Sequence, residues 1–290
     1  MKNLDLSTLP AKKRKQIVSC LRAGIQLLYF LFLPSVFTAA FNGVKYIFTQ
    51  IGQGEKIEMT AFVSALLLVC AFTIVFGRFF CGFACAFGSL GDAMHAIYGI
   101  ICKKRKKKPR RIKPELAKKL ALVKYGILLL IALCCFAGVY QKARGTSPWD
   151  VFSMLHAGNF RLSSYIPGIV LLVLILVGMF FEERFFCRFL CPMGAVFSLL
   201  PILPFFTLHR KRENCIRGCS ACTRQCLSAV ELPSNGSVEI SGDCFQCQKC
   251  IDTCPKGNIR CGVKELYGNE ILFTLFRAVF LLTLLLWAGI

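Results

Sequence analysis

The chain has 290 residues, of which 56% are hydrophobic, and it carries a formal net charge of +21. This composition argues against an ordinary soluble protein. The basic excess does not indicate a nucleic-acid partner, because the Lys and Arg residues lie beside apolar runs, where they can contact lipid headgroups.

Five apolar runs predict membrane helices, since a helix of roughly 20 apolar residues crosses a bilayer. They cover residues 17–41, 59–76, 120–140, 165–181 and 271–290. The first run is longer than the core of a signal peptide, so it predicts a retained helix. The last run contains Arg277. An interfacial helix with Arg277 reaching the headgroups is therefore the alternative for this run.

Loop charge predicts the orientation of these helices. The basic segment 103–111 and the cluster 209–212 far exceed the basic content of the loops around 42–58 and 141–164. Basic loops remain in the cytoplasm. We therefore expect a multi-pass protein of the inner (cytoplasmic) membrane, surrounded by lipid, with its N-terminus and its cysteine-rich segment in the cytoplasm.

An eleven-residue pattern occurs twice. RFFCGFACAFG at 78–88 recurs 106 residues later as RFFCRFLCPMG at 184–194, and the apolar runs before it recur at the same offset. The repeat predicts a membrane unit over 1–208 built from a duplicated helix pair, with copies at about 15–100 and 118–208. Both copies would enter the membrane from the same side, so their twofold axis would follow the membrane normal.

Residues 209–266 are polar and rich in cysteine, and they predict a ferredoxin-like module. One run, Cys244, Cys247, Cys250, Cys254 and then Pro255, has the spacing of a bacterial [4Fe-4S] ferredoxin. The other run is Cys215, Cys219, Cys222 and Cys226, with one extra residue in its first gap. In two-cluster ferredoxins the fourth cysteine of each run binds the other cluster. One cluster would then take Cys215, Cys219, Cys222 and Cys254, and the other Cys244, Cys247, Cys250 and Cys226. Zinc is the weaker interpretation, because zinc sites usually pair two ligands and then leave a long gap.

The repeated pattern contains four further cysteines, which are Cys81, Cys85, Cys187 and Cys191. Residues four apart share one face of a helix, so the two pairs could offer four sulfurs to an additional metal or iron-sulfur centre. The alternative is a structural motif in which small residues allow close packing near the helix ends. Cys261 exceeds the eight ligands that two clusters need, and it is expected to be a free thiol.

The duplicated RFFCxxxC motifs followed by two ferredoxin motifs resemble the NapH/NosR family of membrane 4Fe-4S proteins over residues 15–262. The resemblance implies a mainly α fold: a polytopic helical membrane unit, a cytoplasmic two-cluster module and, at 267–290, a C-terminal membrane or interfacial helix. It also implies quinol oxidation or electron relay as the redox subunit of a quinol dehydrogenase-type system. Flavin would belong to a partner protein, because the outer flavin-binding domain of NosR-type members is not in this sequence. Ala86 departs from the proline that the family has after the second motif cysteine.

The leading interpretation is a membrane-bound relay between a quinol or cytoplasmic donor and a partner reductase or flavoprotein. The outer loop at 148–150 contains Trp149 and is a candidate edge of a quinone pocket. Two alternatives remain open: a factor that reduces or inserts a metal for a respiratory enzyme, and a redox sensor.

Overall fold

The protein is a bundle of helices with one small sheet, and the expected mainly α class is confirmed. The computed structural model describes all residues except 1–10, 108, 110–111, 141–144, 161–162, 204–205, 211–214, 229, 231–237, 240, 263–269 and 290. The α-helices are α1 (Ala11–Phe32), α2 (Val36–Gln53), α3 (Ala61–Phe76), α4 (Ala86–Lys104), α5 (Pro114–Leu120), α6 (Val123–Phe136), α7 (Pro148–His156), α8 (Ile166–Phe181), α9 (Pro192–Leu199), α10 (Ala221–Gln225), α11 (Lys249–Thr253) and α12 (Glu270–Trp287). The other elements are the π-helices η2 (Phe80–Ala84) and η5 (Phe186–Leu190), the 3-10 turn η4 (Ser163–Tyr165) and the strands β1 (Leu208–Arg210), β2 (Val238–Glu239) and β3 (Ile259–Cys261).

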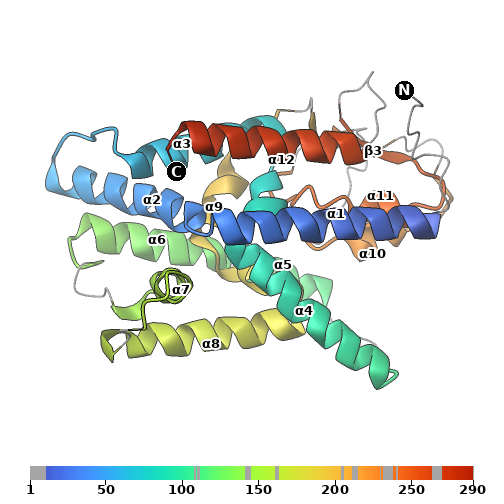
Figure 1. Cartoon of the computed structure of the whole chain (residues 1–290), viewed down its shortest axis with the longest axis horizontal. Helices are drawn as coiled ribbons and strands as arrows, with labels where there is room; N and C mark the ends of the chain where they lie inside the picture. Colours follow the sequence, from blue (N-terminus) through green and yellow to red (C-terminus); the bar gives the residue numbers. More distant parts are fainter. Residues whose placement is uncertain are drawn as a thin grey trace.

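The long helices lie side by side, from α12 and α3 at the top of Figure 1 to α8 at the bottom. The short elements α10, α11 and β3 gather at the right end of the bundle, beside the beginning of α1. Helices α3 and α8 are each followed in the chain by one copy of the repeated motif, and α9, which follows the second copy, lies near the middle of the picture. Leu227 and Phe245 of the cysteine-rich segment pack in the same apolar cluster as the four motif cysteines.

Three helices are long and apolar enough to cross a membrane among the described residues. They are Glu115–Phe136, which joins α5 and α6, Ser163–Phe181 and Glu270–Trp287. They agree with three of the predicted runs. The run at 59–76 forms α3, whose 16 residues follow the N-cap Thr60 and end at Gly77. At about 1.5 Å per residue, α3 is shorter than the hydrocarbon core. These helices identify the chain as a membrane protein.

The prediction of one continuous helix over 17–41 is wrong. The segment divides into α1 and α2, which meet at an angle of 62°. Pro34 lies in the break. Proline has no N–H for the helix and its ring collides with the preceding turn, so the helix ends and restarts. Apolar periodicity shows which residues enter the membrane, but it does not show this bend.

Arg277 does not reach the headgroups, so the interfacial alternative for α12 is wrong in this respect. Its side chain is 0% exposed and lies between the rings of Phe79 and Phe273, with Cζ at 4.5 and 4.4 Å from their centroids. Helix α12 packs along α3, and its inner face is buried at Ala278, Leu281 and Leu285.

The cysteine-rich segment contains a three-stranded antiparallel sheet in the order β2-β1-β3. Strand β1 begins at Leu208, on the membrane side of the predicted boundary at 208/209, and it pairs with β3. Leu227 and Phe245 also join the apolar cluster of the membrane unit. The two predicted units therefore share a strand and a core. Lys211 and Arg212 and the predicted boundary at 266/267 lie outside the described residues.

Candidate metal centres

The first ferredoxin-like site is a hollow lined by four thiols from both cysteine runs, those of Cys215, Cys219, Cys222 and Cys254. Arg210 Nη2 donates to Cys215 Sγ at 3.5 Å, and the Asn258 N–H donates to Cys254 Sγ at 3.4 Å. The described lining contains no carboxylate and no imidazole. A set of thiol donors alone fits an iron-sulfur cluster.

The second hollow is lined by Cys226, Cys244, Cys247 and Cys250. Cys222 lines both hollows, so the two sites are adjacent. Helices α10 and α11 explain why the fourth cysteine of each run lies in the hollow formed by the other run. Each carries one cysteine and ends at a C-cap cysteine, Cys226 or Cys254, with extended backbone. The extended residue turns away from its own run and toward the other hollow.

The loop before α11 holds an unusual backbone. Gln246 and Gln248 are buried non-glycine residues with φ of 52° and 61°. Such strained conformations concentrate at ligand sites, where the surroundings fix them. The Gln248 amide donates to Thr274 of α12 at 2.8 Å, which ties the loop of the second hollow to the last membrane helix.

Burial makes free thiolates unfavourable in the second hollow. Desolvation raises the pKa of the Cys250 thiol well above its usual range, and the neighbouring Cys247 and Cys244 raise it further. Cluster assembly requires these thiols to lose their protons, and bonding to iron compensates that cost.

The repeated motif has the same backbone in both copies. In η2 the Cys85 N–H donates to Phe80 O at 2.9 Å, and in η5 the Cys191 N–H donates to Phe186 O at 2.9 Å. These i to i−5 bonds define π-turns, which are frequent at functional sites. The regular α-helix expected for this segment is therefore corrected to a π-turn followed by a new helix.

The second cysteine of each motif begins that new helix. Cys85 is the N-cap of α4 and Cys191 the N-cap of α9. The Gly194 N–H donates to Cys191 Sγ at 3.2 Å, whereas the Cys85 side chain accepts no capping hydrogen bond. A helix N-terminus stabilises a thiolate. Proline and alanine both suit the first helical position, so Ala86 in place of proline preserves the motif.

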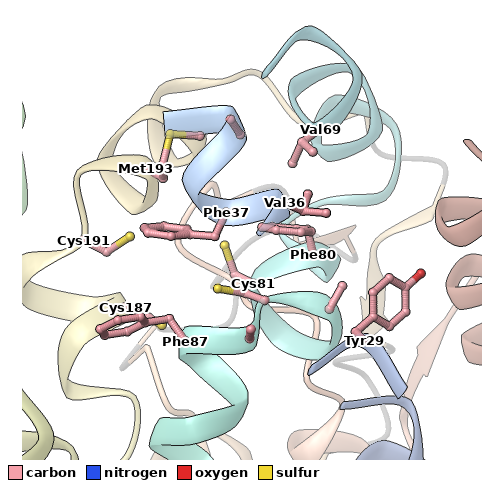
Figure 2. Packing of buried hydrophobic residues seen from close by; sticks show 14 of the residues in the cluster. Tyr29, Val36, Phe37, Val69, Phe80, Cys81, Phe87, Cys187, Cys191 and Met193 are labelled. Carbon is pink, nitrogen blue, oxygen red and sulfur yellow. The ribbon is translucent and has the colours of Figure 1, made fainter. Parts of the chain in front are cut away.

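The four motif cysteines are all buried and lie between the two copies. Cys81, Cys187 and Cys191 turn toward the same region in Figure 2, with Phe37 and Phe87 beside it. The charges of the four thiols interact with one another. The structure thus brings together all four sulfurs that the repeat singled out.

Each motif arginine reaches across to the other copy. Arg184 donates through Nη1 to Cys81 O and through Nη2 to Gly82 O at 2.9 Å. A Cβ atom on Gly88 would lie 2.5 Å from Arg184 Nη1, and one on Gly194 would lie 3.0 Å from Arg78 Nη2. The last glycine of each motif therefore leaves space for the arginine of the other copy.

The guanidinium groups of these two arginines place positive charge beside the motif cysteines. Arg78 and Arg184 are each 1% exposed. Arg184 is paired with Asp92. Nε and Nη2 of Arg78 have no hydrogen-bond partner among the described residues, and its charge lies beside Cys81 and Cys191. Arg78 is also paired with Asp243, so its two unpartnered N–H groups leave room for a further hydrogen-bond acceptor.

The motif and the second hollow meet at Phe245. This ring follows Cys244 in the chain and lies under Arg78 and Arg184, with their Cζ atoms at 4.7 and 5.8 Å. Asp243 lies in the same loop. Its carboxylate accepts hydrogen bonds from Lys124 at 2.5 Å and from Arg78 at 3.3 Å, and these bonds hold the loop against the membrane unit. Burial opposes ionisation of Asp243, but Lys124 and Arg78 outweigh it and lower its pKa. Sequence reasoning missed Asp92, Lys124 and Asp243, which have no motif spacing.

Comparisons with known proteins agree with this site. Residues 59–109 and 166–207 match the 4Fe-4S binding domain family. These segments contain both copies of the repeated motif and none of the eight cysteines at 215–254. No solved structure matches the chain.

Three relatives illustrate the sequence similarity. An uncharacterized protein of Methanocaldococcus jannaschii is 27% identical over 83% of this chain and 93% of its own length. The ferredoxin-type protein NapH of Haemophilus influenzae is 24% identical over 66% of this chain and 64% of its own length. The regulatory protein NosR of Pseudomonas aeruginosa is 23% identical over 70% of this chain but only 29% of its own length. By these relatives and the 4Fe-4S domain match, the chain is similar to the NapH/NosR-type ferredoxin proteins.

Proposed function

We propose that this protein relays electrons at the membrane through two [4Fe-4S] clusters, one in each ferredoxin-like hollow. The observation that carries the proposal is the composition of the hollows. One collects Cys215, Cys219, Cys222 and Cys254, and the other Cys226, Cys244, Cys247 and Cys250. This is the crossed ligand set of a two-cluster ferredoxin.

The shared wall at Cys222 supports electron exchange between the two clusters. Cys219 is exposed, so the first site faces a partner at the surface, while the second adjoins the motif through Phe245. The clusters supply the one-electron chemistry. The chain's own residues hold the clusters, exclude water from the second site and place positive charge beside it.

A third iron-sulfur centre at Cys81, Cys85, Cys187 and Cys191 is the second proposal. The four buried thiols, the incompletely paired Arg78 and the 4Fe-4S family match over these segments all favour it. A purely structural motif would not need buried cations beside buried thiols.

The test is anaerobic purification in detergent, followed by iron and acid-labile sulfide analysis and low-temperature EPR after dithionite reduction. Two clusters give about eight iron per chain and three give about twelve. The variant in which all four motif cysteines become serine should lose about four iron and one EPR signal. A matched variant with Cys20, Cys70, Cys134 and Cys135 changed to serine should lose none.

Four other outcomes would contradict these proposals. Zinc in place of iron would exclude electron transfer. Iron that is unchanged in the motif variant would assign the motif a structural role. A motif that binds added copper and no iron would favour the assembly-factor alternative, whereas full clusters without transfer to any acceptor would favour a sensor.

The orientation and partners follow from the same arrangement. We infer that the end carrying α10, α11, β3 and the start of α1 faces the cytoplasm (Figure 1). The N-terminus and the basic segment 103–111 are expected on the same side. Redox proteins and a membrane quinone are the expected partners, and any flavin belongs to a partner.

A further inference from the structure

A cavity of about 310 Å³ lies where the membrane helix Glu115–Phe136 meets the cysteine-rich segment. It is lined by Ala117 and Ala121 of this helix and by Ser228 and Ser241 of the cysteine-rich segment. Small-molecule sites have volumes of about 300–1,000 Å³. This cavity is at the lower end of that range, so it suits a compact polar group.

Positive charge dominates the cavity. Its described lining contains four cationic side chains and one carboxylate, which are Arg78, Lys118, Lys124, Arg188 and Asp243. Arg188 is paired with Glu182, which lies outside the lining. Arg78 and Lys124 are each 1% exposed, and both donate to the same oxygen, Asp243 Oδ1, at 3.3 and 2.5 Å. Asp243 therefore compensates only one of these two buried charges, and an uncompensated buried charge is costly.

Lys124 also has a donor left for a ligand. An ammonium group has three N–H groups. Lys124 Nζ donates to two oxygens in the described part of the chain, Ser198 Oγ at 2.8 Å and Asp243 Oδ1. It lies 4.9 Å from the centre of the Tyr125 ring, which lines the same cavity. An anion with several acceptor oxygens would satisfy the third N–H and supply the missing negative charge.

The cavity is at the level of the lipid headgroups. Lys118 and Leu122 line it from the beginning of the helix Glu115–Phe136, which is long and apolar enough to cross a membrane. Leu122 is also 66% exposed, and its exposed face continues along the helix at Leu129 and Leu133. Basic residues at the end of a membrane helix lie among phosphate headgroups.

We propose that this cavity binds a phosphate group, held by Lys124 and Arg78 and by the exposed Lys118. The position beside Leu122 favours the headgroup of an anionic phospholipid, whose acyl chains would follow the exposed face of α6. A free phosphate ion has the same chemistry. The bound group would join α6 to the cysteine-rich segment beside Phe245, which also lines the cavity. The proposal is independent of the electron relay, because no cluster takes part in the binding.

Native mass spectrometry of the full chain in a neutral detergent tests the lipid source. Phosphatidylglycerol should remain bound, and phosphatidylcholine, which has no net charge, should not displace it. Lys118→Glu, and Ala121→Trp, which fills the cavity, should each weaken the binding roughly tenfold or more. Lys119→Glu is the matched control. It makes the same charge change at an exposed neighbour outside the described lining, and it should retain the lipid.

Inorganic phosphate tests the soluble source. A ligand that binds only the folded state stabilises it. If the ion binds the cavity, it should raise the unfolding temperature of delipidated protein above that in chloride of equal ionic strength, and Lys118→Glu should abolish this shift. Either ligand, bound in the control and lost in both cavity variants, supports the site and identifies its source. Equal loss in Lys118→Glu and Lys119→Glu, equal retention of phosphatidylcholine, or no response to either ligand would overturn it. Iron content affects none of these results, so they leave the proposed relay untouched.

Discussion

At the residue scale, the last glycine of each motif has a specific steric role. Gly88→Ala should destabilise the protein by about 1–3 kcal/mol, because its new methyl group meets Arg184 and the surrounding core cannot yield freely. Gly99→Ala is the matched control on the same helix, since a Cβ there meets nothing within 4 Å. Removing this glycine should stabilise α4 by roughly 0.5–1 kcal/mol. Thermal unfolding in detergent measures both. Equal shifts in the two variants would refute the steric role.

The same residues show how far sequence alone extends. Cysteine spacing predicted the two sets of four thiols that the hollows bring together, because short-range spacing is enough to wrap a cluster. The sequence could not identify Arg184 as the partner of Gly88, although Gly88 lies in the first copy of the repeated motif and Arg184 in the second. That contact passes between two copies 106 residues apart, and no local pattern records which arginine faces which glycine.

At the element scale, helix α12 brings a buried charge to the second hollow. The Arg277 guanidinium faces the Cys261 thiol, and its charge interacts with the Cys261 and Cys244 thiols. A charged residue inside a membrane helix is costly, so it usually has a functional reason. Apolar periodicity predicted the helix and left the direction of Arg277 open, because a long side chain can point inward or reach the headgroups.

Arg277→Met should lower the midpoint potential of one cluster. Reduction makes a cluster more negative, so a nearby buried cation favours the reduced form. A tenfold change in the redox equilibrium corresponds to about 59 mV for one electron, and we expect a shift of this order. EPR-monitored potentiometry measures it. Arg277→Lys should restore most of the potential, and Arg260→Met, on the exposed face of β3, should have little effect. A shift in Arg260→Met as large as that in Arg277→Met would show that only overall charge matters.

At the scale of the whole molecule, the membrane unit and the cysteine-rich segment form one structure. Lys124, only 2% exposed on α6, pairs with Asp243 of the cysteine-rich segment, and α12 returns along α3 to enclose the junction. The boundary at 208/209, predicted from the change in polarity, stays a prediction, and packing continues across it at Leu208, Leu227 and Phe245. A long-range strand pairing and a shared core decide the boundary, and neither is visible in local composition.

Topology is the property on which the direction of electron flow depends. If both basic segments are cytoplasmic, the α2–α3 and α7–α8 connections face the other side, and the bent pair α1–α2 must cross as one broken span. If α1 and α2 instead form a re-entrant loop, the α2–α3 connection returns to the cytoplasm. Alkaline phosphatase fused after Glu55 or Gly158 should be active, and green fluorescent protein fused after Lys106 or Gly262 should fluoresce. An inactive phosphatase and a fluorescent fusion at Glu55 would show that α1 and α2 do not cross.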